Sequence, residues 1–430
     1  MNAETDPIIK PARTVRGSVR LPGDKSISHR YAMLGAVAAG ATRLDNFSTA
    51  ADCASTLGCV EALGARVTRT GGKVEIEGCG GELAAPRRAL DCGNSGSTMR
   101  MLSGVVAGYG FRSEMMGDES LSRRPMGRII EPLTRMGARI KASDGDRPPL
   151  VIEGAQLQGL TYEMPVTSAQ VKSCVLLAGL RASGKTVVQE KIATRDHTEL
   201  ALRAFGAHVE SQAGSVSIEG GQRLTAIEAY VPGDLSTATF FLCAAAMFAE
   251  SNLIFDHVLL NPTRAGILDV LATMGLKVGF LKVEDLHGET IGSVQVQSGK
   301  LTGAVISGAL SAALIDELPA LAALAPYTRD GLEIRDAREL RVKESDRIAA
   351  VSENLRRMGV RFEEREDGWK IPGQQQPHGA ELESFGDHRI AMAFAIAALR
   401  AVGESRIRHA DAVAVSFPEF FTTLASVVEA

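Results

Sequence analysis

The pattern of apolar and polar positions repeats along the chain as a helix, a glycine and a strand. Amphipathic stretches such as CASTLGCVEALG and RIAAVSENLRRMG have the apolar spacing of a helix. Such stretches lead into strings with glycine in second place: LGARV at 63–67, MGARI at 136–140, FGAHV at 205–209, MGLKV at 274–278 and MGVRF at 358–362. Because glycine readily takes the left-handed conformation that ends a helix, we expect a glycine cap and a new strand at each string.

The spacing of these strings predicts internal duplication. Successive strings lie 73, 69, 69 and 84 residues apart, so a unit of about 70 residues fits six times into 430, with a truncated last unit in FPEFFTTLASVVEA. A longer internal similarity relates LPGDKSISHRYAMLGAVAAG at 21–40 to VPGDLSTATFFLCAAAMFAE at 231–250. Two halves of three units each are the simplest account. We therefore expect two domains, 1–22 plus 233–430 and 23–232, with a ligand site in the cleft between them.

The small residues of several apolar stretches predict where the helices lie. Runs such as AMLGAVAAG and FLCAAAMFA are apolar or small on every side, as in a helix that is buried all round. Together with the repeated strands, they predict an α/β fold with buried helices and outer sheets.

Composition narrows the class of protein. A formal net charge of −4 excludes a globally basic nucleic-acid binder, so an anion site must be a local basic cluster. The sequence shows neither an apolar run of about 18 residues nor a secretion signal in MNAETDPIIKPARTVRG. No CxxC pair or Cys–His metal spacing occurs among Cys53, Cys59, Cys79, Cys92, Cys174 and Cys243, so we expect reduced thiols, no metal and a cytoplasmic protein.

Several glycine or serine turns lead into apolar helices and carry basic residues. In PGDKSISHR at 22–30, Ser26 stands at an expected helix start between Lys25 and Arg30; in DCGNSGSTMR at 91–100, Gly96 leaves the backbone open to a ligand. Similar turns occur at SLSRRPM (120–126), SAQVKS (168–173), TRDHTE (194–199) and GDHR (386–389). Each string alone also fits a capped helix with surface charges. Arg123 and His197 are better explained as surface and structural residues.

Two strings place carboxylates where they can transfer protons. Glu344 lies between Lys343 and Arg347 in RVKESDR, and Asp316 is embedded in the apolar run LIDEL. Burial raises the pKa of a carboxyl and neighbouring cations lower it, so both residues are candidates for acid–base chemistry. A solvated helix start remains the alternative for RVKESDR.

Taken together, these strings resemble the 5-enolpyruvylshikimate-3-phosphate synthase family. The similar segments span 21–421 in order and include LPGDKSISHR, DCGNSGSTMR, SLSRRPMGRIIEPL, TSAQVKSCVLLAGL, VPGDLSTATFF, LRVKESDRI, GDHRIAMAFA and SFPEFF. RVKESDR with GDHR is highly specific, and PGDKSISHR resembles the class II branch. The resemblance implies an inverse α/β barrel of two domains, each with three βαβαββ units. It also implies transfer of an enolpyruvyl group from phosphoenolpyruvate to shikimate 3-phosphate by addition and elimination, without metal or cofactor.

The resemblance also implies the roles of individual residues. The catalytic residues would be Asp316, Glu344 and Lys25, and which of them delivers each proton stays open. Shikimate 3-phosphate would contact Lys25, Ser26, Arg30, Ser168, Ala169, Gln170, Arg195, Asp316 and Lys343. Phosphoenolpyruvate would contact Lys25, Gly96, Arg124, Gln170, Arg347 and Arg389.

The sequence departs from the family pattern at three places. No Lys follows Lys370, so a lysine that some members place near the C-terminal Phe-Pro is missing. Glu339 and Leu340 stand where the family has an Asn, and NSGST replaces NAGT. Gly96 is retained, and we therefore expect inhibition by glyphosate.

Two other functions fit parts of the pattern. A UDP-N-acetylglucosamine enolpyruvyl transferase would use a Cys near position 115, but none lies between Cys92 and Cys174. A non-catalytic anion-binding repeat protein would not require Asp316, Glu344 and Lys25. We expect a monomer whose partners are its small-molecule substrates, with no nucleic acid and no membrane.

Overall fold

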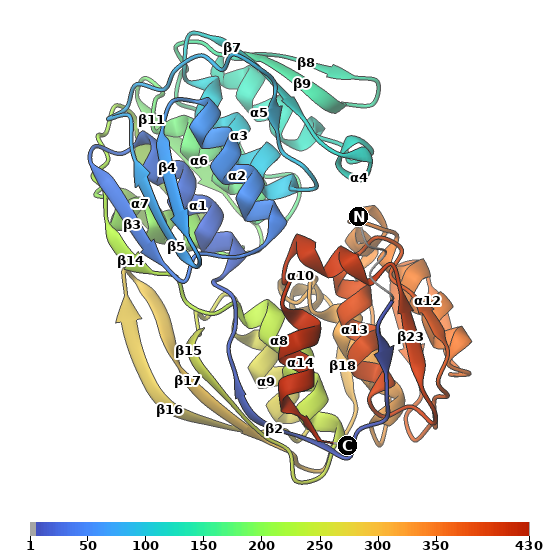
Figure 1. The fold of residues 1–430 in the computed structure, drawn as a ribbon. Coiled ribbons are helices and arrows are strands. Elements are labelled where there is room, and N and C mark those ends of the chain that lie inside the picture. Colours follow the sequence, from blue (N-terminus) through green and yellow to red (C-terminus); the bar gives the residue numbers. More distant parts are fainter. Residues whose placement is uncertain (1–5, 430) are drawn as a thin grey trace. The chain divides into compact units, whose positions relative to one another are not determined.

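The computed structural model describes residues 6–429, which form two compact units (Figure 1). Unit 1 contains the residues up to Pro22, Pro232–Glu284 and the residues from Thr290 onward; unit 2 contains Gly23–Val231 and Asp285–Glu289. The chain thus changes unit at both PGD strings. The expected boundaries differ from these at residue 232 and at 285–289, the tip of a hairpin whose two strands otherwise lie in unit 1.

Unit 2 repeats one sheet pattern three times. In each four-stranded sheet, a parallel pair is extended by two antiparallel strands, in the orders β14-β3-β5-β4, β6-β7-β9-β8 and β10-β11-β13-β12. The strands are β3 (Ala41–Asp45), β4 (Arg66–Thr70), β5 (Lys73–Glu77), β6 (Leu90–Asp91), β7 (Arg112–Met116), β8 (Arg139–Ser143), β9 (Arg147–Glu153), β10 (Thr161–Glu163), β11 (Lys185–Gln189), β12 (Val209–Gln212), β13 (Ser215–Glu219) and β14 (Glu228–Tyr230).

Three helices lie inside the sheets of unit 2: α1 (Lys25–Val37), α3 (Gly96–Ala107) and α6 (Ala169–Gly179) (Figure 1). Their small residues allow close packing, since a Cβ on Gly104 of α3 would lie 2.2 Å from the carbonyl oxygen of Cys174 on α6. The remaining helices of this unit are α2 (Ala51–Ala62), α4 (Glu119–Ser122), α5 (Gly127–Met136) and α7 (His197–Ala204).

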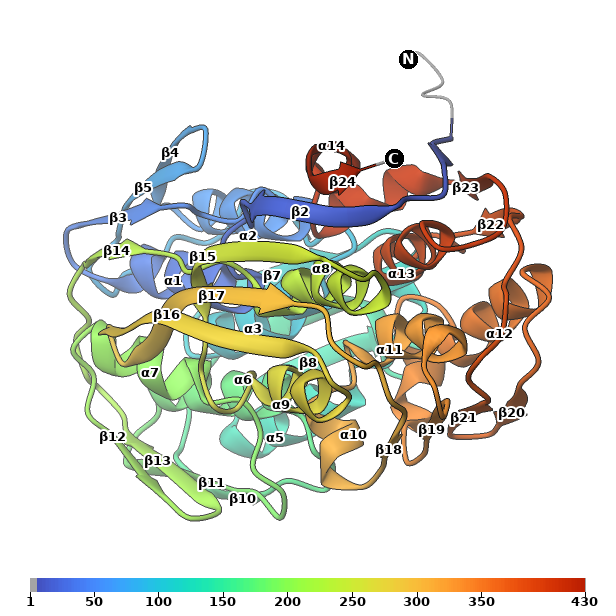
Figure 2. The same cartoon turned by 90° about the horizontal axis from the view of Figure 1, so that it is seen from below.

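In the part of the chain that the structure describes, unit 1 also has three sheets, but its first sheet has five strands and its third sheet has three (Figure 2). The sheet orders are β16-β17-β15-β2-β24, β18-β19-β21-β20 and β1-β23-β22. The strands are β1 (Ile8–Ile9), β2 (Thr14–Val19), β15 (Asn252–Leu259), β16 (Lys277–Leu286), β17 (Glu289–Gln297), β18 (Ala304–Ile306), β19 (Leu332–Ile334), β20 (Glu363–Arg365), β21 (Gly368–Ile371), β22 (Glu381–Glu383), β23 (Ser405–Arg408) and β24 (Val428–Glu429).

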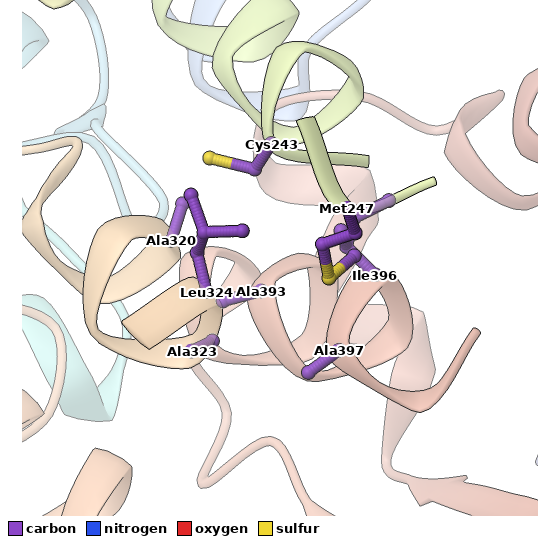
Figure 3. A pocket seen from close by; sticks show the side chains of 8 residues that line it. All are labelled: Cys243, Met247, Ala320, Ala323, Leu324, Ala393, Ile396 and Ala397. Atoms are coloured by element: carbon purple, nitrogen blue, oxygen red, sulfur yellow. The ribbon is translucent and has the colours of Figure 1, made fainter. Parts of the chain in front are cut away.

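The inner helices of unit 1 are α8 (Leu235–Met247), α11 (Leu318–Leu324) and α13 (His388–Ala398). Figure 3 shows eight side chains, four of them alanine, where these helices meet. The gap that they line has no room for a water molecule. The other helical segments are α9 (Gly266–Thr273), α10 (Ala309–Ala313), α12 (Arg347–Arg357), α14 (Phe420–Val427), and the 3-10 turns η1 (Ala325–Tyr327), η2 (Arg338–Val342) and η3 (Ala410–Val415). Buried helices and outer sheets are therefore confirmed, as is the α/β class.

The predicted glycine caps are also confirmed. A helix ends one or two residues before each of the five glycines, and a strand begins two to four residues after each glycine. The glycines have φ between +72° and +117°: Gly64, Gly137, Gly206, Gly275 and Gly359. This left-handed backbone is one that other residues rarely adopt. Within residues 6–429, no helix has the length and apolar character needed to cross a membrane.

Candidate active site

The start of α1 carries Lys25 on a short, capped turn. The helix begins at Lys25, one residue before the expected start, because the side chain of Asp24 accepts a hydrogen bond from the N–H of Ile27 at 2.9 Å. Lys25 Nζ donates to Asp52 Oδ2 of α2 at 2.6 Å. This ion pair, which the sequence did not predict, orients the ammonium group of the predicted catalytic lysine.

Arg30, one turn further along α1, is buried and fixed by other elements. Its guanidinium donates to the hydroxyls of Thr198 and Ser173, both at 2.7 Å, and to the carbonyl of Ser26 at 2.8 Å. Burial lowers the pKa of Arg30 to about 10; the carboxylate of Glu199 opposes this change, and the nearby guanidinium of Arg195 adds to it. Arg30 is therefore still a cation at neutral pH, and Arg195 lies close enough to repel it.

The start of α3 forms a cradle between two guanidinium groups. A Cβ on Gly96 would lie 3.0 Å from Arg100 Nη1 and 3.4 Å from Arg124 Nη1. Arg124 is buried, and its Nη2 donates to Asn94 Oδ1 at 2.6 Å. A helix N-terminus with two adjacent cations and no side chain in the way can bind a phosphate or carboxylate group.

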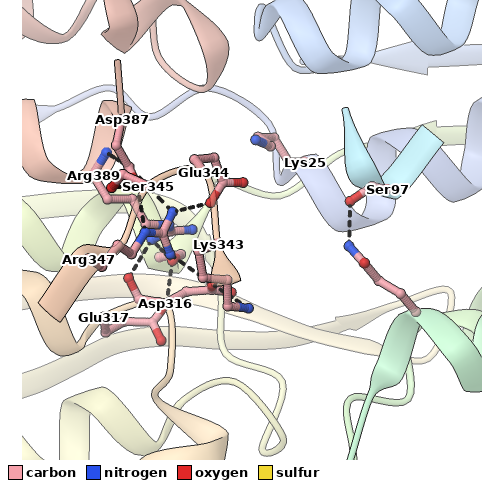
Figure 4. Close-up of polar contacts among 12 residues, drawn as sticks. Lys25, Ser97, Asp316, Glu317, Lys343, Glu344, Ser345, Arg347, Asp387 and Arg389 are labelled. Atoms are coloured by element: carbon pink, nitrogen blue, oxygen red, sulfur yellow. Dashed lines mark hydrogen bonds and ion pairs between the residues drawn. The ribbon is translucent and has the colours of Figure 1, made fainter. Parts of the chain in front are cut away.

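Gln170 connects α6 to this cradle. Its Oε1 accepts a hydrogen bond from Arg100 Nη1 at 2.7 Å, and its Nε2 donates to Ser97 Oγ at 2.9 Å, a bond drawn in Figure 4. Ser168 caps α6 by accepting from the N–H of Val171 at 3.4 Å. Unit 2 thus gathers the predicted residues of 168–170 and the cradle around Gly96.

In unit 1, the predicted acid–base residues meet around Arg347 (Figure 4). Arg347 Nη2 donates to Glu344 Oε2 at 2.6 Å, and Nη1 lies 3.6 Å from Asp316 Oδ1. Its Nε donates to Asp387 Oδ2 at 2.8 Å, and Asp387 also caps α13. Lys343 Nζ lies 3.9 Å from Asp316 Oδ1. Asp316 therefore faces two cationic side chains.

Arg389 lies on the first turn of α13 and contacts the main chain of Asp316. Its Nη1 donates to the main-chain carbonyl of Asp316 and to Ser236 Oγ, both at 2.8 Å. Ser236 in turn donates a short hydrogen bond to Glu317. The predicted phosphoenolpyruvate ligands Arg347 and Arg389 are thus brought together in unit 1, on the starts of α12 and α13.

The structure adds polar partners that sequence reasoning missed. Asp52, Asn94, Arg100 and Asp387 each bond a predicted residue. The position of Arg100 next to the cradle could have been predicted, because Arg100 follows Gly96 by one helical turn and so lies on the same face of the helix. The role of Asp52 could not have been predicted in this way, because its contact with Lys25 joins two separate helices.

His197 and Arg123, which were not assigned to the site from the sequence, make contacts outside it. His197 is buried and bonds Glu289 Oε1 through Nδ1 at 2.6 Å. Arg123 pairs with Glu119 at the surface.

A hollow in unit 1 and the grouping of possible metal ligands among the described residues add nothing to the set of predicted site residues. A hollow of about 710 Å³ in unit 1 is lined by residues such as Tyr327, Arg329 and Arg400 and contains none of the predicted site residues. Among residues 6–429, no three His, Cys, Asp or Glu side chains are grouped to hold a metal ion.

The fold is shared with enolpyruvyl transferases. A solved structure of the enolpyruvyl transferase NikO from Streptomyces tendae covers 98% of both chains with a TM-score of 0.78; at 20% identity this likeness concerns the fold alone. An EPSP synthase structure from Acinetobacter baumannii matches with a TM-score of 0.87 and 40% identity over 98% of both chains.

Sequence relatives give the family. The sequence model of EPSP synthase (3-phosphoshikimate 1-carboxyvinyltransferase) matches residues 9–424. A 3-phosphoshikimate 1-carboxyvinyltransferase from Koribacter versatilis is 60% identical over 98% of this chain and 99% of its own. The chain belongs to the EPSP synthase family.

Proposed function

We propose that this chain transfers the enolpyruvyl group of phosphoenolpyruvate to the 5-hydroxyl of shikimate 3-phosphate and releases phosphate. Family membership over residues 9–424 supports the reaction. The observation that carries the proposal is the carboxylate of Asp316, which lies 3.9 Å from Lys343 and 3.6 Å from Arg347. A carboxylate beside two cations is placed to accept a proton from a hydroxyl group of an anionic substrate bound there.

The two substrates are proposed to use different sets of cations. Shikimate 3-phosphate binds Lys25, Ser26, Arg30, Ser168, Ala169, Gln170, Arg195, Asp316 and Lys343. Phosphoenolpyruvate binds Lys25, Gly96, Arg124, Gln170, Arg347 and Arg389. Because these residues come from both units, we propose that both units act on one pair of substrates. The hydrogen bonds of Arg30, Arg124 and Arg347 support the proposal, because they hold the guanidinium groups in place before an anion arrives.

In the addition step, the 5-hydroxyl oxygen of shikimate 3-phosphate attacks C2 of phosphoenolpyruvate. Asp316 takes the hydroxyl proton, and Glu344, assisted by Lys25, gives a proton to the methylene carbon. The product is a tetrahedral adduct with a methyl group. The ion pair of Lys25 with Asp52 supports this assignment, because it orients the ammonium group.

In the elimination step, the carboxylate of Glu344 takes back a proton from the methyl group as the C2–O bond to phosphate breaks, and the proton held by Asp316 passes to the departing phosphate. The new double bond forms between C2 and the former methyl carbon, and inorganic phosphate leaves. Arg124, Arg347 and Arg389 stabilise the negative charge on the departing phosphate.

An assay of phosphate release with both substrates tests the function. We expect turnover with shikimate 3-phosphate as acceptor and none with UDP-N-acetylglucosamine. Asp316→Asn should reduce kcat by about 10²–10⁴-fold, typical of a lost general base, and retain shikimate 3-phosphate binding by calorimetry. Transfer to the uridine nucleotide would overturn the proposal. Wild-type turnover by Asp316→Asn would overturn the role of this residue.

We also propose that the enzyme works as a monomer in the cytoplasm. All six cysteines are free thiols, which supports a reducing compartment. Every residue assigned to either substrate belongs to this one chain. Light scattering after size exclusion should give a mass of about 45.5 kDa, and a dimer mass would contradict the proposed monomer.

A further inference from the structure

The irregular loop at 190–196 carries Arg195 from the end of β11 to the start of α7. Arg195 lies near Arg30, since its charge lowers the pKa of that guanidinium. Two like charges at this range repel each other, and the repulsion grows where water is excluded. An attachment of the loop to the rest of unit 2 therefore helps to keep Arg195 beside Arg30 against this repulsion.

Lys172, on the neighbouring helix α6, provides such an attachment. Its side chain is 2% exposed, and Nζ lies 3.0 Å from Glu190 Oε2 at the start of the loop and 2.7 Å from Glu199 Oε1 just beyond its end. Nζ also donates to the carbonyl of Thr194 at 3.4 Å. One ammonium group thus makes three contacts: with Glu190 at the start of the loop, with the carbonyl of Thr194 next to Arg195, and with Glu199 in the first turn of α7.

The second oxygen of Glu190 closes the loop on itself. Glu190 Oε1 accepts hydrogen bonds from the N–H of Thr194, at 3.1 Å, and from its hydroxyl group. Thr194 directly precedes Arg195. The main chain of Arg195 is therefore held by contacts that end on Lys172.

The charge of Lys172 is needed where it lies. Glu190 and Glu199 are both almost fully buried, and burial raises the pKa of Glu199 while the charge of Lys172 opposes the rise. Without the ammonium group, two buried carboxylates would lack their common partner. Breaking a buried ion pair in this way is far more costly than losing a surface pair.

We propose that Lys172, through Glu190 and Glu199, is a positioning residue for shikimate 3-phosphate: it holds the 190–196 loop so that Arg195 stays beside Arg30. This inference rests on the proposed function, because it takes Arg195 as a ligand of the substrate phosphate. Lys172 itself does not touch the substrate. It should therefore affect substrate affinity and not the chemical steps.

Steady-state kinetics of Lys172→Met test the proposal. We expect KM for shikimate 3-phosphate to rise by at least about tenfold, as for a broken buried ion pair, while kcat and KM for phosphoenolpyruvate change by less than about threefold. Lys185→Met is the matched control. Lys185 pairs with Glu210 in the same unit, at 2.7 Å, but the two side chains are 45% and 50% exposed, so we expect its KM values to match the wild type.

A double-mutant cycle separates positioning from general stability. If Lys172 acts through Arg195, Lys172→Met should raise KM less than about twofold in an Arg195→Gln background. An unchanged KM in the single variant, or the same increase in both backgrounds, would overturn the proposal. If Lys172→Met does not fold, Glu190→Gln replaces it, because the amide still accepts from Thr194 but loses the ion pair.

The wild-type assay distinguishes this proposal from the proposed function. Absence of wild-type turnover would contradict the function. Calorimetric titration with shikimate 3-phosphate then still tests the loop: weaker binding by Lys172→Met supports the positioning role, and wild-type affinity refutes it.

Discussion

At the scale of single residues, Arg347 and Lys343 respond differently to burial. Burial lowers the pKa of Arg347, but the carboxylates of Asp387 and Glu344 outweigh it and raise the pKa overall. For Lys343, burial prevails over the attraction of Asp316, and the pKa is lowered. Arg347 is thus a permanent cation, whereas Lys343 loses its proton more readily than an exposed lysine.

Gly96→Ala tests the cradle at α3. The added methyl group would lie 3.0 Å and 3.4 Å from guanidinium nitrogens of Arg100 and Arg124, so these side chains must shift. We expect KM for phosphoenolpyruvate to rise by about tenfold, with KM for shikimate 3-phosphate nearly unchanged, because only phosphoenolpyruvate is proposed to bind in the cradle. The wild type should be inhibited by glyphosate, and the variant less so.

Inhibition curves and KM values for both substrates provide the measurement. Gly58→Ala is the matched control, since a Cβ on Gly58 would meet nothing within 4 Å. A wild type that high glyphosate leaves fully active would contradict the expected inhibition. Equal KM values in Gly96→Ala and the wild type would contradict the cradle.

At the scale of elements, the same helix–glycine–strand joint is used five times. At Gly275 the joint is especially tight, with φ at +110° and a Cβ position 2.2 Å from the carbonyl oxygen of Lys300. Neither the backbone conformation nor the space admits a side chain there. The glycine is therefore required by geometry at this joint, whereas Gly58 inside α2 meets no such limit.

Gly275→Ala and Gly58→Ala should have opposite effects on stability. Gly275→Ala should lower the free energy of unfolding by at least about 2 kcal/mol through backbone strain and steric overlap. Gly58→Ala should raise it by about 0.5–1 kcal/mol, because alanine loses less backbone entropy in a helix. Urea unfolding followed by far-UV circular dichroism measures both. A Gly275→Ala variant as stable as the wild type would show that the joint adapts.

At the scale of the whole molecule, the residues proposed to carry the chemistry come from both units. Unit 2 carries Lys25, Arg30 and Arg124, and unit 1 carries Asp316 and Arg347. The proposal that one pair of substrates uses both sets implies that binding energy draws the units together.

Small-angle X-ray scattering tests this implication. The radius of gyration should fall when shikimate 3-phosphate and glyphosate are added together, since both sets of cations then have an anion to bind. UDP-N-acetylglucosamine, which is not an expected acceptor, should leave it unchanged. A radius that stays the same with both ligands would argue against closure as part of catalysis.

Much of the fold was predictable because local rules determine it. The glycine caps at the five strings depend on backbone conformation, and the buried helices depend on a run of small apolar residues, so both are visible in a single segment. The start of α1 was misplaced by one residue because Asp24, not the following residues, supplies the cap. Several polar side chains near a helix start can accept hydrogen bonds from the free N–H groups, and the local geometry of the first turn decides which one does so.

The sequence by itself determined the repeat, the α/β class, the basic helix starts and, through its motifs, the family. Only the tertiary structure decided which side chains bond one another: Lys25 with Asp52, Arg100 with Gln170, Arg347 with Asp387, and Lys172 with two glutamates. These pairs join separate elements, and their members lie 18 to 70 residues apart. Periodicity and capping act over a few residues, whereas such contacts exist only once sheets and helices have packed.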